Sequence, residues 1–321
     1  MNIAAMNTTT AAWAAGIETS YLGLKHDLAR GALREAKFRH SLAGSDPALE
    51  VLDADVIFAD VGGQMHAFVT GEGSGAGAAV AMLSVIGATS TVKWTAGGRV
   101  EIRQVSDGRQ NLQVPATCAG GFPAGWHMSG DPATPDAVRD LLAWLSGHPG
   151  EIPHLCLRRI LLDVVLSGRR CCDIDLLCLI DGRPVAVEYK RKTPSRDLKF
   201  GINTGQFRAL RHLVAAGIPV LHAITLYDGN TGRDCQFLGS NLTQDVLAGV
   251  AASPTALAPS KTSYHGISKQ EYLPVPANTF SQLDDGLPGA WGRGLAALAR
   301  GTGTRLVSRD LLLQCARREV A

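Results

Sequence analysis

The spacing of hydrophobic and polar residues changes along the chain. Between residues 51 and 105, apolar and polar residues alternate in short runs that are separated by Gly62-Gly63 and Gly97-Gly98. Such a pattern predicts short strands joined by tight turns. We expect a helix within residues 20–42, followed by a β-rich meander with strands at Val51–Val61, Gln64–Thr70, Ser90–Trp94 and Arg99–Val105.

The middle of the chain combines strand and helical periodicity. Two apolar runs flank Asp181-Gly182, and a helix with Phe207 and Leu210 on its inner stripe precedes a continuous apolar run. The order hairpin, helix, buried strand is typical of an α/β fold. The other expected elements are helices within Pro132–Gly147, over Pro153–Leu166 and over Thr204–Gly217, a strand at Ile218–Leu226, a loop or linker at Ala252–Ser260 and a helical tail at Trp291–Val320.

The length and composition indicate a globular protein of more than one domain. The chain has 321 residues, of which 45% are hydrophobic and 19% charged. We predict an N-terminal α+β domain at residues 1–146, a core at 147–230, and a C-terminal extension at 231–321 that packs on the core. No run approaches the roughly 18 apolar residues of a membrane span, and the N-terminus lacks a secretion signal. We therefore expect a cytoplasmic protein without membrane association.

Charge and cysteine content refine this picture only locally. The net charge is +2, but from Glu151 to Arg211 twelve Lys and Arg stand against seven Asp and Glu, a local balance of +5. A basic middle suits a phosphate-facing surface, and a solvated helix face explains it equally well from charge alone. The seven cysteines include no pair at the two-residue spacing of zinc sites, so we interpret them as reduced core thiols.

A glycine-rich segment at Thr70–Gly77 precedes the apolar run Ala78–Ile86. This order is similar to a strand, a phosphate loop and a helix, which leaves nucleotide binding as an alternative. The segment lacks the Lys-Ser/Thr pair of a triphosphate loop, and no acidic residue follows at the distance required for a ribose. We interpret it as a flexible loop.

The hairpin around Asp181-Gly182 carries the candidate chemistry. An Asp-Gly pair between apolar runs is the strongest short-range signal for a two-residue turn. Counting back from this turn places Asp175 opposite Glu188 and Asp173 opposite Lys190, with all four side chains on one face. Opposed β-carbons lie roughly 5 Å apart, so the two facing carboxylates can share one cation.

Two facing carboxylates repel each other unless a cation or a proton neutralises them. Mg²⁺ suits them because it favours oxygen ligands and takes only one or two carboxylates, and Mn²⁺ can substitute. Lys190 would assist electrostatically or help to activate the attacking water. The alternative is an ordinary charge ladder, with Asp173 paired to Lys190 and Glu188 at the surface.

The order helix, Asp175, hairpin, Glu188-Tyr189-Lys190, helix, strand resembles the PD-(D/E)XK nuclease superfamily. Residues 173–177 and 187–190 are similar to the Asp and Glu-x-Lys strands of Holliday-junction resolvases. Gln206 is similar to the glutamine of the virus-type replication-repair nucleases. The resemblance covers about residues 151–226, and Ile174 stands where the family pattern has proline.

The resemblance implies a restriction-endonuclease-like core, in which helices flank a mixed central sheet, beside the β-rich N-terminal domain. It implies a Mg²⁺-dependent deoxyribonuclease, an endonuclease of restriction or defence, recombination or repair. The implied catalytic residues are Asp175, Glu188 and Lys190. The implied metal ligands are Asp175 and Glu188, with Glu151 as the candidate third acid. The implied DNA-binding residues are Gln206, Lys192, Arg196 and Arg208. A helix-dipole role explains Glu151 equally well.

Other functions remain open at this point. A catalytically inactive nuclease-fold module that binds nucleic acid is the main alternative, and the complete Asp, Glu and Lys set favours the enzyme. The expected partners are DNA and, as one option, a second copy of the chain. His154, His212 and His222 surround the motif, but lone histidines are more often hydrogen-bonded structural residues than ligands or bases, and we assign none of them.

Overall fold

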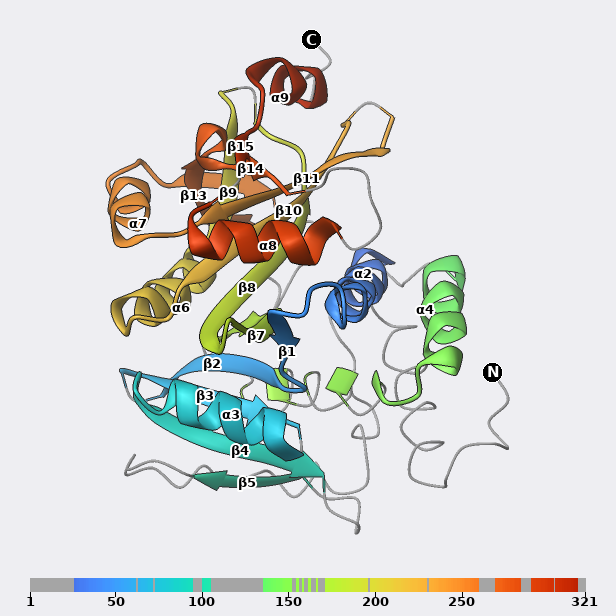
Figure 1. Cartoon of the computed structure of the whole chain (residues 1–321), viewed down its shortest axis with the longest axis vertical. Helices are drawn as coiled ribbons and strands as arrows, with labels where there is room; N and C mark the ends of the chain where they lie inside the picture. The colour runs from blue at the N-terminus through green and yellow to red at the C-terminus, as the bar shows by residue number, and fades with distance from the viewer. Residues whose placement is uncertain are drawn as a thin grey trace. The chain divides into compact units, whose positions relative to one another are not determined.

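The computed structural model describes most of the chain, which forms two compact units (Figure 1). The described residues are 26–61, 63–71, 73–94, 100–104, 135–151, 154–155, 158, 161–162, 166, 171–195, 197–229, 231–259, 269–283, 290–302 and 304–316. Unit 1 draws its described residues from Met1–Phe38, Asp53–Asp173 and Pro259–Gln270, and unit 2 from Arg39–Leu52, Ile174–Ala258 and Glu271–Ala321. Each unit thus combines segments distant in sequence, whereas the sequence analysis divides the chain into three consecutive segments.

Both units have an α/β architecture with mixed sheets flanked by helices, which confirms the predicted fold class at this level. Unit 1 contains a five-stranded sheet in the order β5-β4-β3-β2-β6. The strands are β2 (Asp55–Val61), β3 (Gln64–Thr70), β4 (Ala88–Trp94), β5 (Val100–Gln104) and β6 (Cys171–Ile174). The helices α2 (His26–Leu42), most of which belongs to unit 1, and α4 (Pro135–Gly147) lie within segments that were predicted to be helical.

The predicted meander in unit 1 is wrong at one connection. The strands β2 and β3 form an antiparallel hairpin, but β3 and β4 pair in parallel. Parallel neighbours require a crossover, and α3 (Gly73–Leu83) supplies it. The glycine-rich segment is therefore the start of a helix and not a flexible loop, because the apolar side of α3 is buried at Ala76, Ala79, Val80 and Leu83.

The glycines before and within α3 allow close packing against Asp53. A β-carbon on Gly71, which has φ +123°, would lie 2.6 Å from the Asp53 carbonyl oxygen. A β-carbon on Gly75 would lie 2.7 Å from the Asp53 backbone nitrogen. This close backbone approach explains why glycine occupies both positions without any need for a bound phosphate.

Unit 2 contains a seven-stranded sheet in the order β1-β7-β8-β10-β11-β14-β15. The central strands β8 (Arg183–Lys192) and β10 (Val220–Tyr227) are parallel, and the other pairs with a recorded register are antiparallel. The remaining strands of this sheet are β1 (Leu49–Val51), β7 (Leu176–Ile180), β11 (Asp234–Asn241), β14 (Ser281–Gln282) and β15 (Arg305–Leu306). The strand β8, which carries the candidate motif, thus lies in the interior of the sheet.

Helices and a smaller sheet complete unit 2. Three strands pair in the order β12-β13-β9. Their bounds are β12 (Ala256–Pro259), β13 (Lys269–Pro276) and β9 (Lys199–Asn203), and the helices are α6 (Thr204–Ala215), α7 (Gln244–Ala251), η4 (Ala277–Thr279), α8 (Ala290–Arg300) and α9 (Arg309–Cys315). The expected loop or linker at Ala252–Ser260 is therefore wrong over β12, which forms because β13 provides a pairing partner. The predicted helix Pro153–Leu166 lies largely outside the described residues.

Among the described residues, no helix is long and apolar enough to cross a membrane.

We predict that Gly71→Ala destabilises unit 1 by about 2–4 kcal/mol, because the added methyl group meets the Asp53 carbonyl oxygen and the positive φ disfavours alanine. Gly77→Ala is the matched control, since its β-carbon would meet nothing within 4 Å in α3. Alanine there should stabilise the helix by roughly 0.5–1 kcal/mol. Urea unfolding with hydrogen exchange of the α3 amides measures both effects, and equal stability of the two variants would contradict the packing role.

Candidate functional site

The hairpin β7–β8 has the predicted two-residue turn. Asp181 and Gly182 have φ values of 52° and 72°, as a tight turn of the I′ type requires. The strands pair from Ile180 opposite Arg183 through to Leu176 opposite Val187. The register predicted from the Asp-Gly turn is therefore confirmed along β7.

This register does not extend to Asp173. The backbone bends at Asp175, and β6 joins β2 in the sheet of unit 1 instead of continuing β7. Within unit 1, Asp173 forms an ion pair with Arg158, whose Nη1 also donates to Glu35 Oε2 at 2.8 Å. The predicted pairing of Asp173 with Lys190 is wrong, because one continuous strand was assumed where the chain changes sheets.

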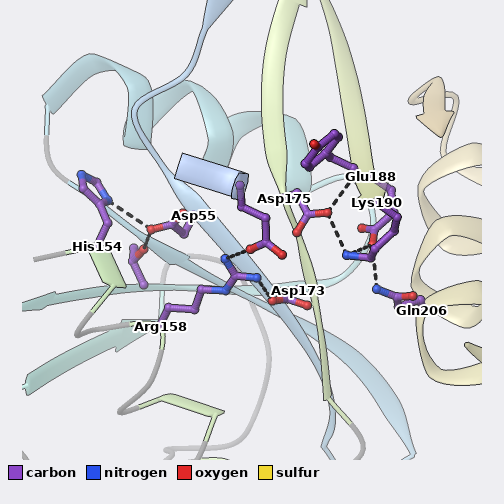
Figure 2. Close-up of polar contacts among 11 residues, drawn as sticks. Asp55, His154, Arg158, Asp173, Asp175, Glu188, Lys190 and Gln206 are labelled. Atoms are coloured by element: carbon purple, nitrogen blue, oxygen red, sulfur yellow. Dashed lines mark hydrogen bonds and ion pairs between the residues drawn. The ribbon is translucent and has the colours of Figure 1, made fainter. Parts of the chain in front are cut away.

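Asp175 and Glu188 form a buried acidic pair around the ammonium of Lys190 (Figure 2). Asp175 is only 4% exposed and Glu188 only 1%. Lys190 Nζ lies 2.7 Å from Glu188 Oε1 and 3.0 Å from Asp175 Oδ2. Asp175 Oδ2 also accepts a hydrogen bond from the Tyr189 backbone N–H at 2.8 Å. The Lys190 ammonium thus contacts both carboxylates, and the Mg²⁺ that the sequence analysis expects between them stays a prediction.

The helix α6 adds Gln206 to this cluster. The helix begins after Asn203, whose side-chain oxygen accepts a hydrogen bond from the Gly205 N–H at 2.8 Å and caps the helix. The Gln206 side-chain amide then donates to Glu188 Oε1 at 2.6 Å (Figure 2). Gln206, which the resemblance implies to be a DNA-binding residue, is therefore directed into the cluster.

The negative charges of the two buried carboxylates are compensated by the Lys190 ammonium inside the protein. Asp175 Oδ1 and Glu188 Oε2, the second oxygens of the two carboxylates, are buried as well. Removing one partner from a buried ion pair typically costs about 3–5 kcal/mol, because a charge is then left uncompensated. Two carboxylates that already converge on one cationic group form an oxygen donor set that fits Mg²⁺. Within the described part of the chain, no group of three or more His, Cys, Asp or Glu side chains is arranged to hold a metal ion.

The predicted DNA-binding residues have different environments. Lys192 is half-buried, and its Nζ donates to the Gly201 carbonyl at 3.1 Å. Burial, followed by the nearby charge of Lys190, lowers the pKa of Lys192 to about 8, and Glu188 opposes this shift. Arg208 is exposed on α6, as is Arg211. Arg196 lies outside the described residues.

Glu151, the candidate third acid, is half-buried and belongs to unit 1, whereas Asp175 and Glu188 belong to unit 2. Its backbone N–H donates to the His148 carbonyl at 3.1 Å. Its role as a metal ligand stays a prediction.

The histidines around the motif differ in kind. In unit 1, His154 Nδ1 lies 3.1 Å from Asp55 Oδ2 (Figure 2), and its Nε2 lies 3.1 Å from Asp53 Oδ1. His222 is different, because it is 1% exposed and its Nδ1 has no hydrogen-bond partner among the described residues.

His222 is the residue that the sequence analysis did not connect with the cluster. It pairs with Glu188 in the parallel ladder of β8 and β10 and with Ser240 across β11. Residues in register in a sheet have side chains on the same face, so Glu188, His222 and Ser240 form a polar row. A histidine within the apolar run Ile218–Leu226 was a signal, but its position beside Glu188 depends on a pairing that the sequence does not specify.

The comparisons with known proteins return no relative. No protein-family model matches the chain, and no curated protein or solved structure matches it at a significant level.

We predict that His222 makes the protein sensitive to acid. Burial, then the charges of Lys192 and Lys190, lower the pKa of His222 to about 3, whereas the pKa of histidine in an unfolded chain is about 6.5. The unfolded state therefore binds the additional proton first, and the stability contributed above pH ~6.5 is lost as the pH falls toward 3, by up to about 1.4 kcal/mol per pH unit.

Glutamine does not titrate, so the unfolded state of His222→Gln takes up no proton at position 222. As the pH is lowered from 7 to 5, the free energy of unfolding of this variant should therefore decrease less steeply than that of the wild type. His212→Gln, at an exposed position on α6, is the control. Urea unfolding at several pH values gives the slopes. Parallel curves for wild type and His222→Gln would contradict the prediction.

Proposed function

We propose that the protein is a Mg²⁺-dependent nuclease that hydrolyses DNA phosphodiester bonds, with Asp175, Glu188 and Lys190 as the catalytic residues. The observation that carries the proposal is the convergence of two buried carboxylates on one cationic group, with Lys190 Nζ 2.7 Å from Glu188 and 3.0 Å from Asp175. A buried acidic pair is costly to maintain, which supports a role in binding a cation rather than in stability alone.

Asp175 and Glu188 would hold the Mg²⁺, and Mn²⁺ would substitute. The bound ion supplies positive charge to the phosphodiester and lowers the pKa of the attacking water. The Tyr189 N–H fixes one oxygen of Asp175, and the Gln206 amide fixes one oxygen of Glu188. Lys190 holds its ammonium at the same oxygens and stabilises the negative charge that develops on the phosphate.

The proposed core is restriction-endonuclease-like. The order of β7, β8 and α6, followed by β10 parallel to β8, supports it, since this is the order of elements that the resemblance implies. Gln206 also supports it, because a glutamine from the helix after the Glu-x-Lys strand contacts the glutamate of that strand. The enzyme would be an endonuclease, so it would cut closed circular DNA.

We predict that Asp175→Asn and Glu188→Gln each reduce DNA cleavage by at least about 100-fold and abolish Mg²⁺ binding. An amide keeps the shape of the side chain but removes the charge that binds the ion. Cleavage of supercoiled plasmid and of linear, branched and single-stranded DNA, with calorimetric Mg²⁺ and Mn²⁺ titrations, measures both properties.

Two matched controls accompany this experiment. Asp181→Asn changes an exposed carboxylate at the turn of the same hairpin, and Asp173→Asn changes the carboxylate two residues before Asp175. Both should retain measurable cleavage. Full activity of Glu188→Gln would refute the nuclease assignment, and wild-type protein that binds DNA without cutting it in either metal would favour the inactive binding module.

The exposed arginines of α6 should act on binding instead of chemistry. If Arg208 and Arg211 contact phosphates, changing both to Gln should flatten the slope of log affinity against log salt by about 1–2, because each lost contact removes roughly 0.7–0.9 from the slope. Fluorescence anisotropy of labelled DNA without added divalent metal measures this slope. Changing Arg305 and Arg309, exposed elsewhere in unit 2, is the control, and equal slopes for both double variants would return Arg208 and Arg211 to a solvated role.

A further inference from the structure

The side chain of Lys192 reaches from β8 to the strand β9. Lys192 alternates with Glu188 and Lys190 along β8, so the three side chains share one face of the sheet. The Lys192 Nζ donates a hydrogen bond to the Gly201 carbonyl oxygen of β9 at 3.1 Å. Burial lowers the pKa of Lys192 to about 8, so the side chain is still largely protonated at neutral pH and this hydrogen bond is charge-assisted. The ammonium therefore ties β9 to β8.

Tyr272 of β13 packs beside this contact. The Lys192 Nζ lies 5.7 Å from the centroid of the Tyr272 ring, within the range of a cation–π contact. A β-carbon on Gly201 would lie only 3.2 Å from Tyr272 Cδ1, so the ring packs directly on the glycine. In the pairing of β13 with β9, Tyr272 is opposite Asn203. The same tyrosine thus supports β9 at the ammonium contact and at the last residue of the strand.

The tied strand leads directly into the cap of α6. β9 ends at Asn203, whose side-chain oxygen accepts a hydrogen bond from the Gly205 N–H at 2.8 Å. The next residue, Gln206, donates to Glu188 Oε1 at 2.6 Å (Figure 2). A short stretch of backbone therefore connects the carbonyl group held by Lys192 with the side-chain amide that holds Glu188.

We propose that Lys192 is a positioning residue of the candidate site, whose ammonium holds β9 so that Gln206 keeps one oxygen of Glu188 in place. The hydrogen bond to Gly201 and the packing of Tyr272 account for the orientation of its side chain, without a DNA phosphate. The effect on catalysis rests on the proposed nuclease function. The coupling between Lys192 and α6 does not depend on that function.

Loss of the ammonium acts on Glu188 in two steps. Without the charge-assisted hydrogen bond, β9 and the cap of α6 become more mobile. The Gln206 amide then no longer fixes the Glu188 oxygen, and groups that orient a metal ligand typically contribute about 10–100-fold to metal affinity or activity. A phosphate contact would act differently, because its loss weakens DNA binding and reduces the salt slope by roughly 0.7–0.9.

The coupling to α6 is measured on the full chain without metal or DNA. Lys192→Met keeps an unbranched side chain but lacks the ammonium, and hydrogen exchange of the Gly205 amide should accelerate by about tenfold or more. Lys199→Met is the matched control, because Lys199 also lies on β9 but pairs with the exposed Asp197 at 2.8 Å. Its exchange should equal that of the wild type. Unchanged exchange in Lys192→Met would overturn the proposal whether or not the protein cuts DNA.

Plasmid cleavage with Mg²⁺ separates positioning from DNA binding. Lys192→Met should lower kcat by about 10–100-fold with little change in the KM for DNA, and the salt slope of its DNA affinity should match that of the wild type. In a double-mutant cycle, Lys192→Met should add little to the loss caused by Gln206→Ala, because both changes break one chain of contacts. Additive losses, or a flattened salt slope with unchanged kcat, would overturn the positioning role. Wild-type protein that cuts no DNA would contradict the nuclease assignment alone, and the exchange result then decides the coupling.

Gly201→Ala reaches the same contact without removing a charge. Its methyl group would meet the Tyr272 ring at 3.2 Å, so the ring or β9 must shift. This variant should accelerate exchange at Gly205 and lower kcat in the same direction as Lys192→Met, and it provides the test if Lys192→Met does not fold. Gly201→Ala protein with wild-type exchange and wild-type kcat would overturn the proposed link between β9 and Glu188.

Discussion

The contact between Lys190 and the two carboxylates is the interaction on which the candidate site depends. Asp175 and Glu188 are almost completely buried, and without a nearby positive charge their mutual repulsion and desolvation would oppose the fold. Lys190 is more exposed than either carboxylate. The same geometry that stabilises the protein also keeps two oxygen donors directed toward one point.

The positions of these groups follow from the central strands of unit 2. In β8, Glu188 and Lys190 are two residues apart, so their side chains lie on one face of the sheet. The parallel partner β10 places His222 beside Glu188, and α6 places Gln206 on the same carboxylate. A strand in the interior of a sheet holds its side chains more firmly than a loop does, which suits a site whose donors must remain close together.

Local signals in the sequence predicted the hairpin and the helix after it. The Asp181-Gly182 turn determines the register of β7 and β8, and the apolar stripe of α6 determines which side of that helix is buried. These features depend on residues that are close in sequence. The carboxylates and the lysine were therefore identified together, although the ladder ends just before Asp175.

The features that were missed depend on distant residues. The chain changes sheets at Asp175 because β2, more than a hundred residues earlier, provides the partner of β6. The helix α3 forms despite its glycines because it must cross between the parallel strands β3 and β4, and packing then outweighs weak helix propensity. The place of His222 beside Glu188 likewise follows from a strand pairing that no local pattern specifies.

The borders of the seven-stranded sheet have a consequence for self-association. Its two outermost strands are β1, with three residues, and β15, with two. Long flat outer strands present rows of backbone N–H and C=O groups that recruit strands from other molecules, and very short ones offer few such groups. The short length of these two border strands therefore limits edge-to-edge association of the sheet. A mutation that lengthened either strand would weaken this protection.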